Sequence, residues 1–572
     1  MSRGIPRSFA AIAATLLTGV CGITASGQVA PSALPSAAPS ASLSPLPGAS
    51  TLPVSPSAGG ASAPAEASPP GTVSATPTAT PTPVPTQPPI IVEPPSAGIV
   101  PGGNQVLRVE SVLGTVAVTV ADPNIVDVSI DQVDRTITLT GKQLGMTTLT
   151  VRDDRGLTRD VPVRVANLAG TVADSVTIRV TGDPATPIFL QEQALNAALA
   201  AAQPRPGAQI IATPDSVNIS QPLTIDNTTT IDVPMIIQGS DYFTVQSVTH
   251  VNVENVALPR IHPSYLMVSD FPETLKENGL LFEATLTSSQ PARFLYYHFN
   301  PAGQPDRRIV LRLHNASSQP ANVQFISGMA GPEVNDMEVG HLSTARFLVR
   351  EANNEGNVLT IAPGDNVTIL AQSLPAQNIV SNLVQVREIS GAPLHLTLIA
   401  QNAADPIDAP EQETQLLVGD VLHARGVYPI PEFYFDYQYD TSGPDLEIPI
   451  GQIPVPELKE GEALAGDYGV LQSVTVRIVN PDSHNAASIA VYANPRGGRA
   501  TGTFIIDGVL LQAHALPPFG HYKLREYTIP PGGFIRTTIV TMPEGGSSYP
   551  LRLDFATDDG STSPGAPNSL IY

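Results

Sequence analysis

Apolar residues at every second position dominate the stretch from residue 104 to 165 and restrict it to β-strands. This two-residue period is that of a strand with one buried face, and it differs from the 3.6-residue period of a helix. The pattern is clearest in three runs: Val116/Val118/Val120, Val126/Val128/Ile130 and Val161/Val163/Val165. The stretch therefore predicts a compact β module with strands at 106–109, 115–120, 125–130, 136–140, 147–152 and 160–165.

Three segments of this module, at residues 107–109, 121–128 and 139–151, carry a family resemblance. The last of them is the most specific, because a strand ends in the turn Thr140-Gly141-Lys142 and a second strand begins at Thr147-Thr148. With these segments the module resembles the pilus formation protein N-terminal domain, which opens the outer-membrane secretins of tight-adherence pilus systems. The resemblance implies an envelope or pilus-associated scaffold and brings no catalytic residues with it. A bacterial immunoglobulin-like module with the same strand rhythm is the alternative.

The overall charge and the cysteine content exclude several function classes. The chain has 572 residues, enough for several domains, and a formal net charge of −22. Such a negative field repels nucleic-acid phosphates, so we expect no nucleic-acid partner. The single cysteine, Cys21, lies in the predicted leader, so the mature chain would have no disulfide, thiol nucleophile or cysteine-based metal site.

The first 27 residues read as a secretory signal peptide. Arg3 and Arg7 precede an apolar run at 9–20 that is too short to span a bilayer, and small residues at 25–27 offer a cleavage site. Cys21 suggests a lipoprotein, but the residues before it do not fit that signal. We therefore expect an exported protein of the periplasm, cell surface or medium, with no transmembrane span in the mature chain.

Residues 28–101 are rich in proline, alanine, serine and threonine and predict a disordered linker. Proline prevents regular strand pairing, and few large apolar side chains are available for a core. Fully extended at about 3.1 Å per residue, such a segment could hold the following domains about 200 Å from an anchor. A linker with no required reach is the alternative.

After the β module, assigned to residues 102–168, residues 169–260 predict a small α+β module. The alanine- and leucine-rich segment 188–202 predicts its helix, which Pro204 and Pro206 would end. Strands are expected at 176–180, 209–212, 216–219, 230–233 and 244–253.

The remainder predicts two related immunoglobulin-like β-sandwiches, at 261–410 and 411–572, with a hinge near 405–413. Each contains a strand ending in asparagine, Asn315 or Asn480, followed by a turn and a second strand. Each later shows a Pro-Gly corner, at Pro363-Gly364 and Pro531-Gly532, that leads into another strand. Both halves also resemble domains of uncharacterised secreted bacterial proteins, which implies no activity. The predicted class is thus all-β and multidomain.

An aromatic run at 433–439 is the candidate ligand-contact site. In a strand, alternate residues share a face, which would group four rings: Phe433, Phe435, Tyr437 and Tyr439. Such a face beside carboxylates could stack on sugars, whereas packing in a core or between domains is the competing and favoured interpretation.

Other chemistry finds little support in the sequence. No motif for nucleophilic catalysis or phosphate binding occurs, and the histidines, such as His298 and His395, lack metal-ligand spacing. We therefore predict no catalytic residues, no metal ligands and no cofactor.

The acidic loops at 153–154, 333–336 and 558–559 are candidate Ca²⁺ sites, but they lack the ligand spacing of a known calcium loop. The segment 448–456 superficially resembles a secretin pore signature, and a connector between strands is the favoured interpretation.

Together these features predict a structural or interaction protein of the cell envelope, in pilus assembly or adhesion, with envelope or pilus proteins as partners. The alternatives are a surface carbohydrate-binding protein and a secreted glycan hydrolase. We expect no enzymatic activity, because no supported catalytic set was found.

Overall fold

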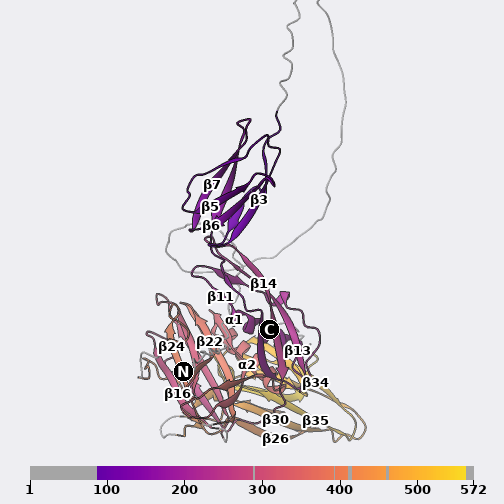
Figure 1. Ribbon diagram of the computed structural model, residues 1–572. Helices are drawn as coiled ribbons and strands as arrows, with labels where there is room; N and C mark the ends of the chain where they lie inside the picture. Colours follow the sequence, from indigo (N-terminus) through magenta and orange to yellow (C-terminus); the bar gives the residue numbers. More distant parts are fainter. Residues whose placement is uncertain (1–86, 288–289, 392, 410–414, 459–462, 562–572) are drawn as a thin grey trace, which may run out of the picture.

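The computed structural model describes residues 87–561, except 288–289, 392, 410–414 and 459–462. The predicted signal peptide and the linker up to residue 86 lie outside the described residues. Strands dominate the described chain, which confirms the predicted all-β, multidomain class, and two α-helices accompany them. Figure 1 shows the β module at one end, an α/β region next to it and the two sandwiches at the other end. None of the helices in the described ranges has the length and apolar character needed to cross a membrane.

The β module consists of two facing four-stranded sheets, and all six predicted strands are confirmed. One sheet has the order β1 (Ile91–Glu93), β3 (Asn104–Glu110), β6 (Thr136–Gly141), β5 (Val126–Asp131). The other has the order β2 (Ala97–Ile99), β8 (Thr158–Val165), β7 (Gly145–Arg152), β4 (Ala117–Val120). Strands β1 and β2 lie inside the predicted linker, so the assignment of a linker up to residue 101 is wrong at its end. Both are edge strands, where neighbouring prolines are tolerated, and their Val92 and Ile99 side chains enter the core.

The α/β region contains the predicted helix, α1 (Pro187–Ala201), which begins where the Thr186 side chain accepts a hydrogen bond from the Phe189 N–H. Its strands are β9 (Gly170–Thr171), β10 (Ser175–Thr181), β11 (Gln203–Pro204), β12 (Gln209–Ile211), β13 (Thr228–Gln238) and β14 (Val245–Asn255). The predicted strand at 216–219 is absent. A short 3-10 turn, Pro214–Ser216, ends there, and residues 217–219 form no strand.

The sheet of the α/β region continues into the first sandwich. Its strand order is β12-β13-β14-β10-β21-β19-β23-β17-β15-β25, with β20 paired to β23. The strands added by the sandwich are β15 (Tyr265–Ser269), β17 (Ala292–Asn300), β19 (Ala321–Ser327), β20 (Ala330–Glu333), β21 (Gly356–Ile361), β23 (Asn378–Ser390) and β25 (Arg425–Tyr428). Facing it is the sheet β16 (Gly279–Leu286), β24 (Leu394–Asn402), β18 (Arg307–His314), β22 (Asn366–Leu374). Strand pairing therefore crosses the boundaries predicted at 260 and 410.

The second sandwich packs a five-stranded sheet against a four-stranded one. The first sheet is β26 (Glu432–Asp440), β30 (Leu471–Val479), β35 (Phe534–Thr541), β32 (Ala500–Ile506), β33 (Val509–Leu516). The second is β27 (Leu446–Ile450), β36 (Leu551–Thr557), β31 (Ala487–Pro495), β34 (Tyr522–Ile529), and β28 (Val455–Pro456) pairs separately with β29 (Ala463–Leu464). This sandwich has its own hydrophobic core.

A second helix, α2 (Asp336–Ala352), lies in a region predicted to be all strand. It packs against β23 of the first sandwich and β32 of the second, and its Phe347 joins a buried cluster that contains Leu295 and Met542 from the two sides. A Cβ atom on Gly340 would lie 1.8 Å from the carbonyl oxygen of Gly545, so only glycine allows this close approach. The helix therefore joins the two sandwiches into one packed unit.

Candidate functional site

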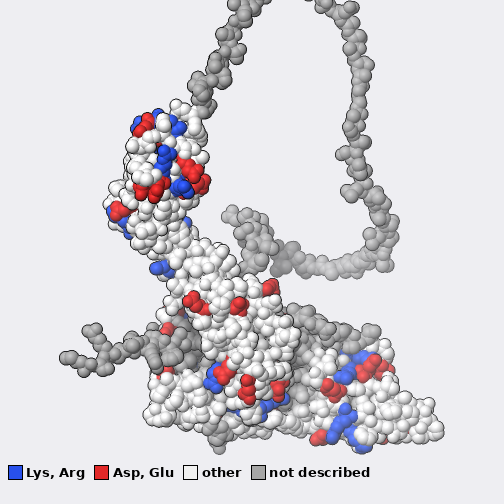
Figure 2. Space-filling model, turned by 45° about the vertical axis from the view of Figure 1, so that its right-hand side comes forward, with Lys and Arg blue, Asp and Glu red and all other residues white. Residues whose placement is uncertain are grey.

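The β module presents a surface with closely mixed charges at one end of the molecule. Figure 2 shows Lys, Arg, Asp and Glu side chains interspersed over it, whereas the adjoining face of the α/β region is mostly uncharged. Residues 87–166 carry seven Lys or Arg and nine Asp or Glu, so this module is nearly neutral in a chain of net charge −22. Its connection to the rest centres on Phe243, whose ring lies 5.4 Å from the Arg164 guanidinium carbon and whose backbone bonds to Asn167 and Ala169.

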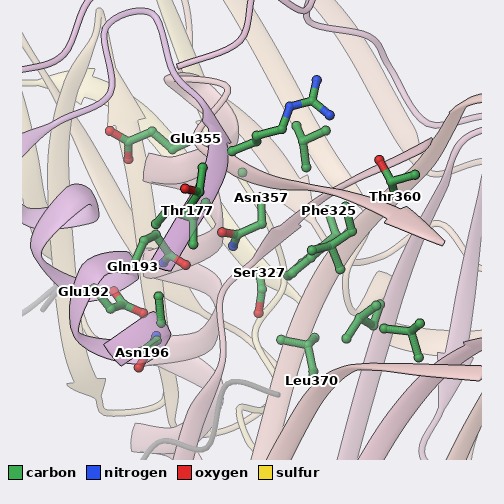
Figure 3. A pocket seen from close by; sticks show the side chains of 18 of the residues that line it. Thr177, Glu192, Gln193, Asn196, Phe325, Ser327, Glu355, Asn357, Thr360 and Leu370 are labelled. Carbon is green, nitrogen blue, oxygen red and sulfur yellow. The ribbon is translucent and has the colours of Figure 1, made fainter. Parts of the chain in front are cut away.

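A cleft of about 960 Å³ lies where the α/β region meets the first sandwich. Helix α1 supplies Glu192, Gln193 and Asn196, and strand β10 supplies Thr177; Phe325 comes from β19 (Figure 3). Further lining residues come from strands β21 and β22, and helix α2 contributes Arg350. The volume is that of a site for a small molecule or a short peptide, and apolar side chains dominate its lining.

The charged groups of the cleft are largely paired with one another. Arg350 bonds to the carboxylate of Glu192 and to the carbonyl of Ser327, and its guanidinium carbon lies 5.9 Å from the ring centre of Phe189. Glu355 is fully buried, and its Oε1 accepts a hydrogen bond from the Thr186 N–H at 2.7 Å. Burial raises the pKa of Glu355. The second carboxylate oxygen of Glu355 and the Nε atom of Arg350 are buried without a hydrogen-bond partner among the described residues.

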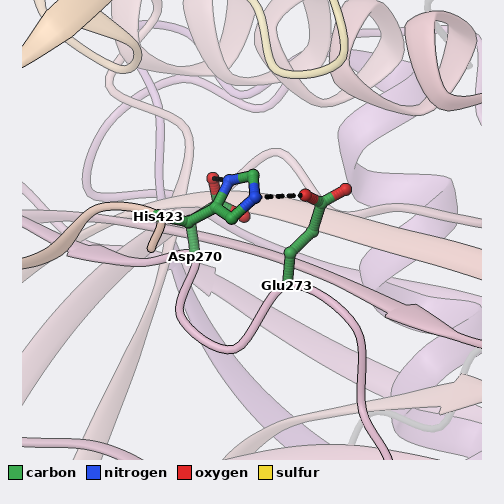
Figure 4. Close-up of side chains that lie close together, drawn as sticks. All are labelled: Asp270, Glu273 and His423. Atoms are coloured by element: carbon green, nitrogen blue, oxygen red, sulfur yellow. Dashed lines mark ion pairs between the residues drawn. The ribbon is translucent and has the colours of Figure 1, made fainter. Parts of the chain in front are cut away.

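A histidine and two carboxylates form a second cluster, shown in Figure 4. His423 Nδ1 lies 3.5 Å from Asp270 Oδ2, and its Nε2 lies 3.1 Å from Glu273 Oε2. Burial raises the pKa of Asp270 to about 6, and the hydrogen bond to Asp270 raises that of His423. The antiparallel pairing of β15 with β25 brings these residues together across the sequence. Their donor types suit a divalent cation, although each group is already paired with another.

A buried polar network joins α2 to the second sandwich. His341 Nδ1 lies 2.9 Å from Glu544 Oε2, and its Nε2 lies 2.8 Å from Gln512 Oε1. Thr503 donates to Glu544 Oε1 at 2.6 Å. Both His341 and Glu544 are fully buried, so the network fixes how the helix and the sandwich pack.

The structure places the four predicted ligand-contact residues on one face of strand β26, and that face points into the protein. Tyr439 is 3 % exposed in the core, and Phe435 and Tyr437 pack against the same core. Phe433 packs against a separate buried cluster. Neighbouring rings stack, with Phe433 and Phe435 centroids 5.8 Å apart. This placement favours the packing interpretation, and the exposed face of the strand carries Tyr434 instead.

The remaining predicted candidates are spread over the molecule. His298 is buried, and burial lowers its pKa to about 4, while His395 is partly exposed beside Glu283. Asp153 bonds to Arg155, and Asp558 bonds to Lys523. The acidic segment 333–336 leads into α2, where Asn335 accepts a hydrogen bond from the Glu338 N–H. The pore-like segment 448–456 forms the end of β27, a turn and β28.

Several solved structures match parts of this chain. Domains 4 and 5 of the S-layer protein SbsC match at 24% identity over 13% of this chain and 50% of that chain, with a TM-score of 0.12. The fibronectin(III)-like modules of Clostridium thermocellum CbhA match at 13% identity over 30% of this chain and 98% of that chain, with a TM-score of 0.16. The Bacteroides ovatus SGBP-B protein in complex with a mixed-linkage heptasaccharide matches at 10% identity over 53% of this chain and 73% of that chain, with a TM-score of 0.13. This chain thus spans half the length of the S-layer structure.

No curated protein matches the chain. One family model does match: that of the pilus formation protein N terminal region, over residues 95–166. These residues cover the two-sheet β module except β1, and they include β2, which lies within the predicted linker. Residues 95–166 thus match the pilus formation protein N-terminal region, which confirms the resemblance of the β module to that family.

Proposed function

We propose that this chain is an exported structural or interaction protein of the cell envelope that acts in pilus assembly or adhesion. The observation that carries the proposal is the match of residues 95–166 to the pilus formation family. The fold supports it, because the module stands at one end while the α/β region and both sandwiches form a continuous packed body (Figure 1). In this role the body holds the module, and the module binds pilus or secretin subunits through its charged surface and its edge strands β4 and β5.

Site-specific photo-cross-linking in the native cell tests this proposal with the full chain. A photoreactive residue replaces Val133, which is 90% exposed on the module, or Val509, which is 51% exposed on the second sandwich. We expect adducts that contain pilus or secretin subunits from position 133 and none from position 509. Adducts at neither position, or equally at both, would contradict a role for the module in pilus binding.

A further inference from the structure

Two neighbouring strands of the large sheet separate part of the way along their length. Strands β10 and β21 pair only at Arg179↔Val358, Val180↔Asn357 and Thr181↔Gly356. Beyond these pairs β10 continues through residues 175–178 while remaining paired with β14. Strand β21 continues through 359–361 while remaining paired with β19. Within these described strands, each therefore has one paired edge and one open edge, and the two open edges face each other.

Open strand edges carry backbone N–H and C=O groups that ordinarily pair with another strand. In this sheet the open edges are internal, so a strand placed between them would pair on both sides. Because β10 and β21 are antiparallel, an inserted strand would be parallel to one of them and antiparallel to the other. This arrangement is a template for an extended peptide.

The cleft of Figure 3 adjoins the gap between the two strands. Thr177 and Thr360 line it from β10 and β21 respectively, at positions where the two strands no longer pair. Two buried amide side chains of α1 also line it: Gln193 is 8% exposed and Asn196 is 6% exposed. Neither side chain makes a hydrogen bond to any residue in the described part of the chain. Both amides line the cleft, so a polar ligand placed there could pair with them.

The charge and polarity of the cleft specify what would bind there. Its two arginines are already paired, Arg350 with Glu192 and Arg179 at 3.7 Å from Glu254, so an anionic ligand would find few unpaired counter-charges. Phe325 and Leu370 contribute apolar surface beside the free amides. A neutral chain with backbone amides and apolar side chains fits both kinds of surface.

We propose that an extended, uncharged peptide segment of a partner protein binds between β10 and β21 as an added strand and places apolar side chains in the cleft. The site lies outside residues 95–166, so this inference goes beyond the proposed function of the module. The added strand would complete the hydrogen bonding of residues 175–178 and 359–361. The amides of Gln193 and Asn196 would bond to the peptide where it crosses the cleft.

Hydrogen exchange of the full chain tests the proposal directly, with a blocked six-residue peptide of alternating valine and threonine as the probe. We expect millimolar peptide to slow the exchange of backbone amides at 175–178 and 359–361 at least threefold. Exchange in β18, in the centre of the facing sheet, should not change. Peptide binding without protection of the two open edges would overturn the proposal, and so would the absence of binding. Protection that rises with protein concentration without peptide would also overturn it, because a second copy of the chain would then be the occupant.

Two matched variants locate the peptide. Asn357→Trp places a large ring in the cleft and should weaken binding at least tenfold. Val248→Trp adds the same ring at an exposed position of β14 in the same sheet and should leave binding unchanged. If Asn357→Trp does not fold, the double variant Gln193→Ala/Asn196→Ala should weaken binding at least threefold. Equal affinities for the folded cleft variant and the β14 variant would overturn the proposal.

Discussion

Asn315 and Asn480 hold the same turn in the two sandwiches. Asn315 directly follows strand β18 and Asn480 directly follows strand β30, and both side chains are almost fully buried. The Nδ2 atom of Asn315 donates to the Ile361 carbonyl at 3.1 Å, and that of Asn480 donates to the Ile529 carbonyl at 3.3 Å. Each side chain thereby ties the turn after one strand to the isoleucine two positions before the proline of the Pro-Gly corner. These matching hydrogen bonds support the prediction from the sequence that the two sandwiches are related to each other.

We expect Asn480→Ala to lower the free energy of unfolding by about 1–3 kcal/mol, because buried carbonyls lose their hydrogen-bond donor. Urea unfolding followed by circular dichroism would measure the change. His484→Ala, in the exposed part of the same turn, should have little effect. Equal losses in the two variants would show that Asn480 contributes no more than its exposed neighbour.

The His341–Glu544 pair should make stability depend on pH. Burial alone would lower the pKa of His341, but the Glu544 charge and hydrogen bonds raise it overall. Burial alone would raise the pKa of Glu544, but His341 lowers it overall. The histidine contribution is therefore complete below its unfolded pKa of about 6.5 and is lost as pH rises through the raised folded value. The glutamate contribution is complete above about pH 4.3 and is lost as pH falls through the lowered folded value.

Glu544→Gln should accordingly lower the free energy of unfolding by about 3 kcal/mol near pH 5.5, because it leaves His341 buried without its counter-charge. The difference from the unmodified protein should shrink at pH 8.5. Urea unfolding at both pH values would test this, with the exposed His484→Gln as control. A difference that is the same at both pH values would contradict the predicted ionisation of the pair.

Phe243 should control how firmly the β module is held. Phe243→Ala removes the ring that packs beside Gly98 and under Arg164, and we expect cleavage by thermolysin within 166–174 to accelerate about tenfold. The melting temperature of the two sandwiches should not change, because their cores do not include Phe243. Ile211→Ala, a truncation on strand β12 that is 40% exposed, is the control. Unchanged cleavage would mean that other contacts hold the module.

Tyr437 should stabilise the second sandwich, since its ring packs against the core. Tyr437→Ala should lower the free energy of unfolding by about 2 kcal/mol, whereas Gln438→Ala on the exposed face of the same strand should cost far less. A glycan array run on both variants distinguishes this packing role of Tyr437 from a role in carbohydrate binding. Loss of a glycan signal in Tyr437→Ala at unchanged stability would favour carbohydrate binding.

The fold was predictable wherever residues near in sequence determine it. The alternation at 104–165 indicated the strands of the β module, and the alanine-rich segment before Pro204 indicated α1. Helix α2 was missed because its glycine and β-branched residues lower helix propensity. Its N-terminal signal, Asn335 followed by Glu338, is present in the sequence, but the same acidic segment also suits a solvent-exposed loop. The cleft was not predictable, since its lining comes from segments far apart in the chain.

The sequence by itself determined the six predicted strands of the β module, helix α1 and the repeat shared by the two sandwiches, and residues 104–165 carried the resemblance to the pilus formation domain. Only the tertiary structure decided which strands are neighbours, as when Thr181 meets Gly356 across 175 residues. It also decided that His341 and Glu544 meet across 203 residues. The physical reason is that strands pair through backbone groups, which every residue type except proline carries in the same form. Side-chain periodicity therefore fixes the face that a strand buries, while packing of the whole chain fixes its partner and leaves the gap between β10 and β21.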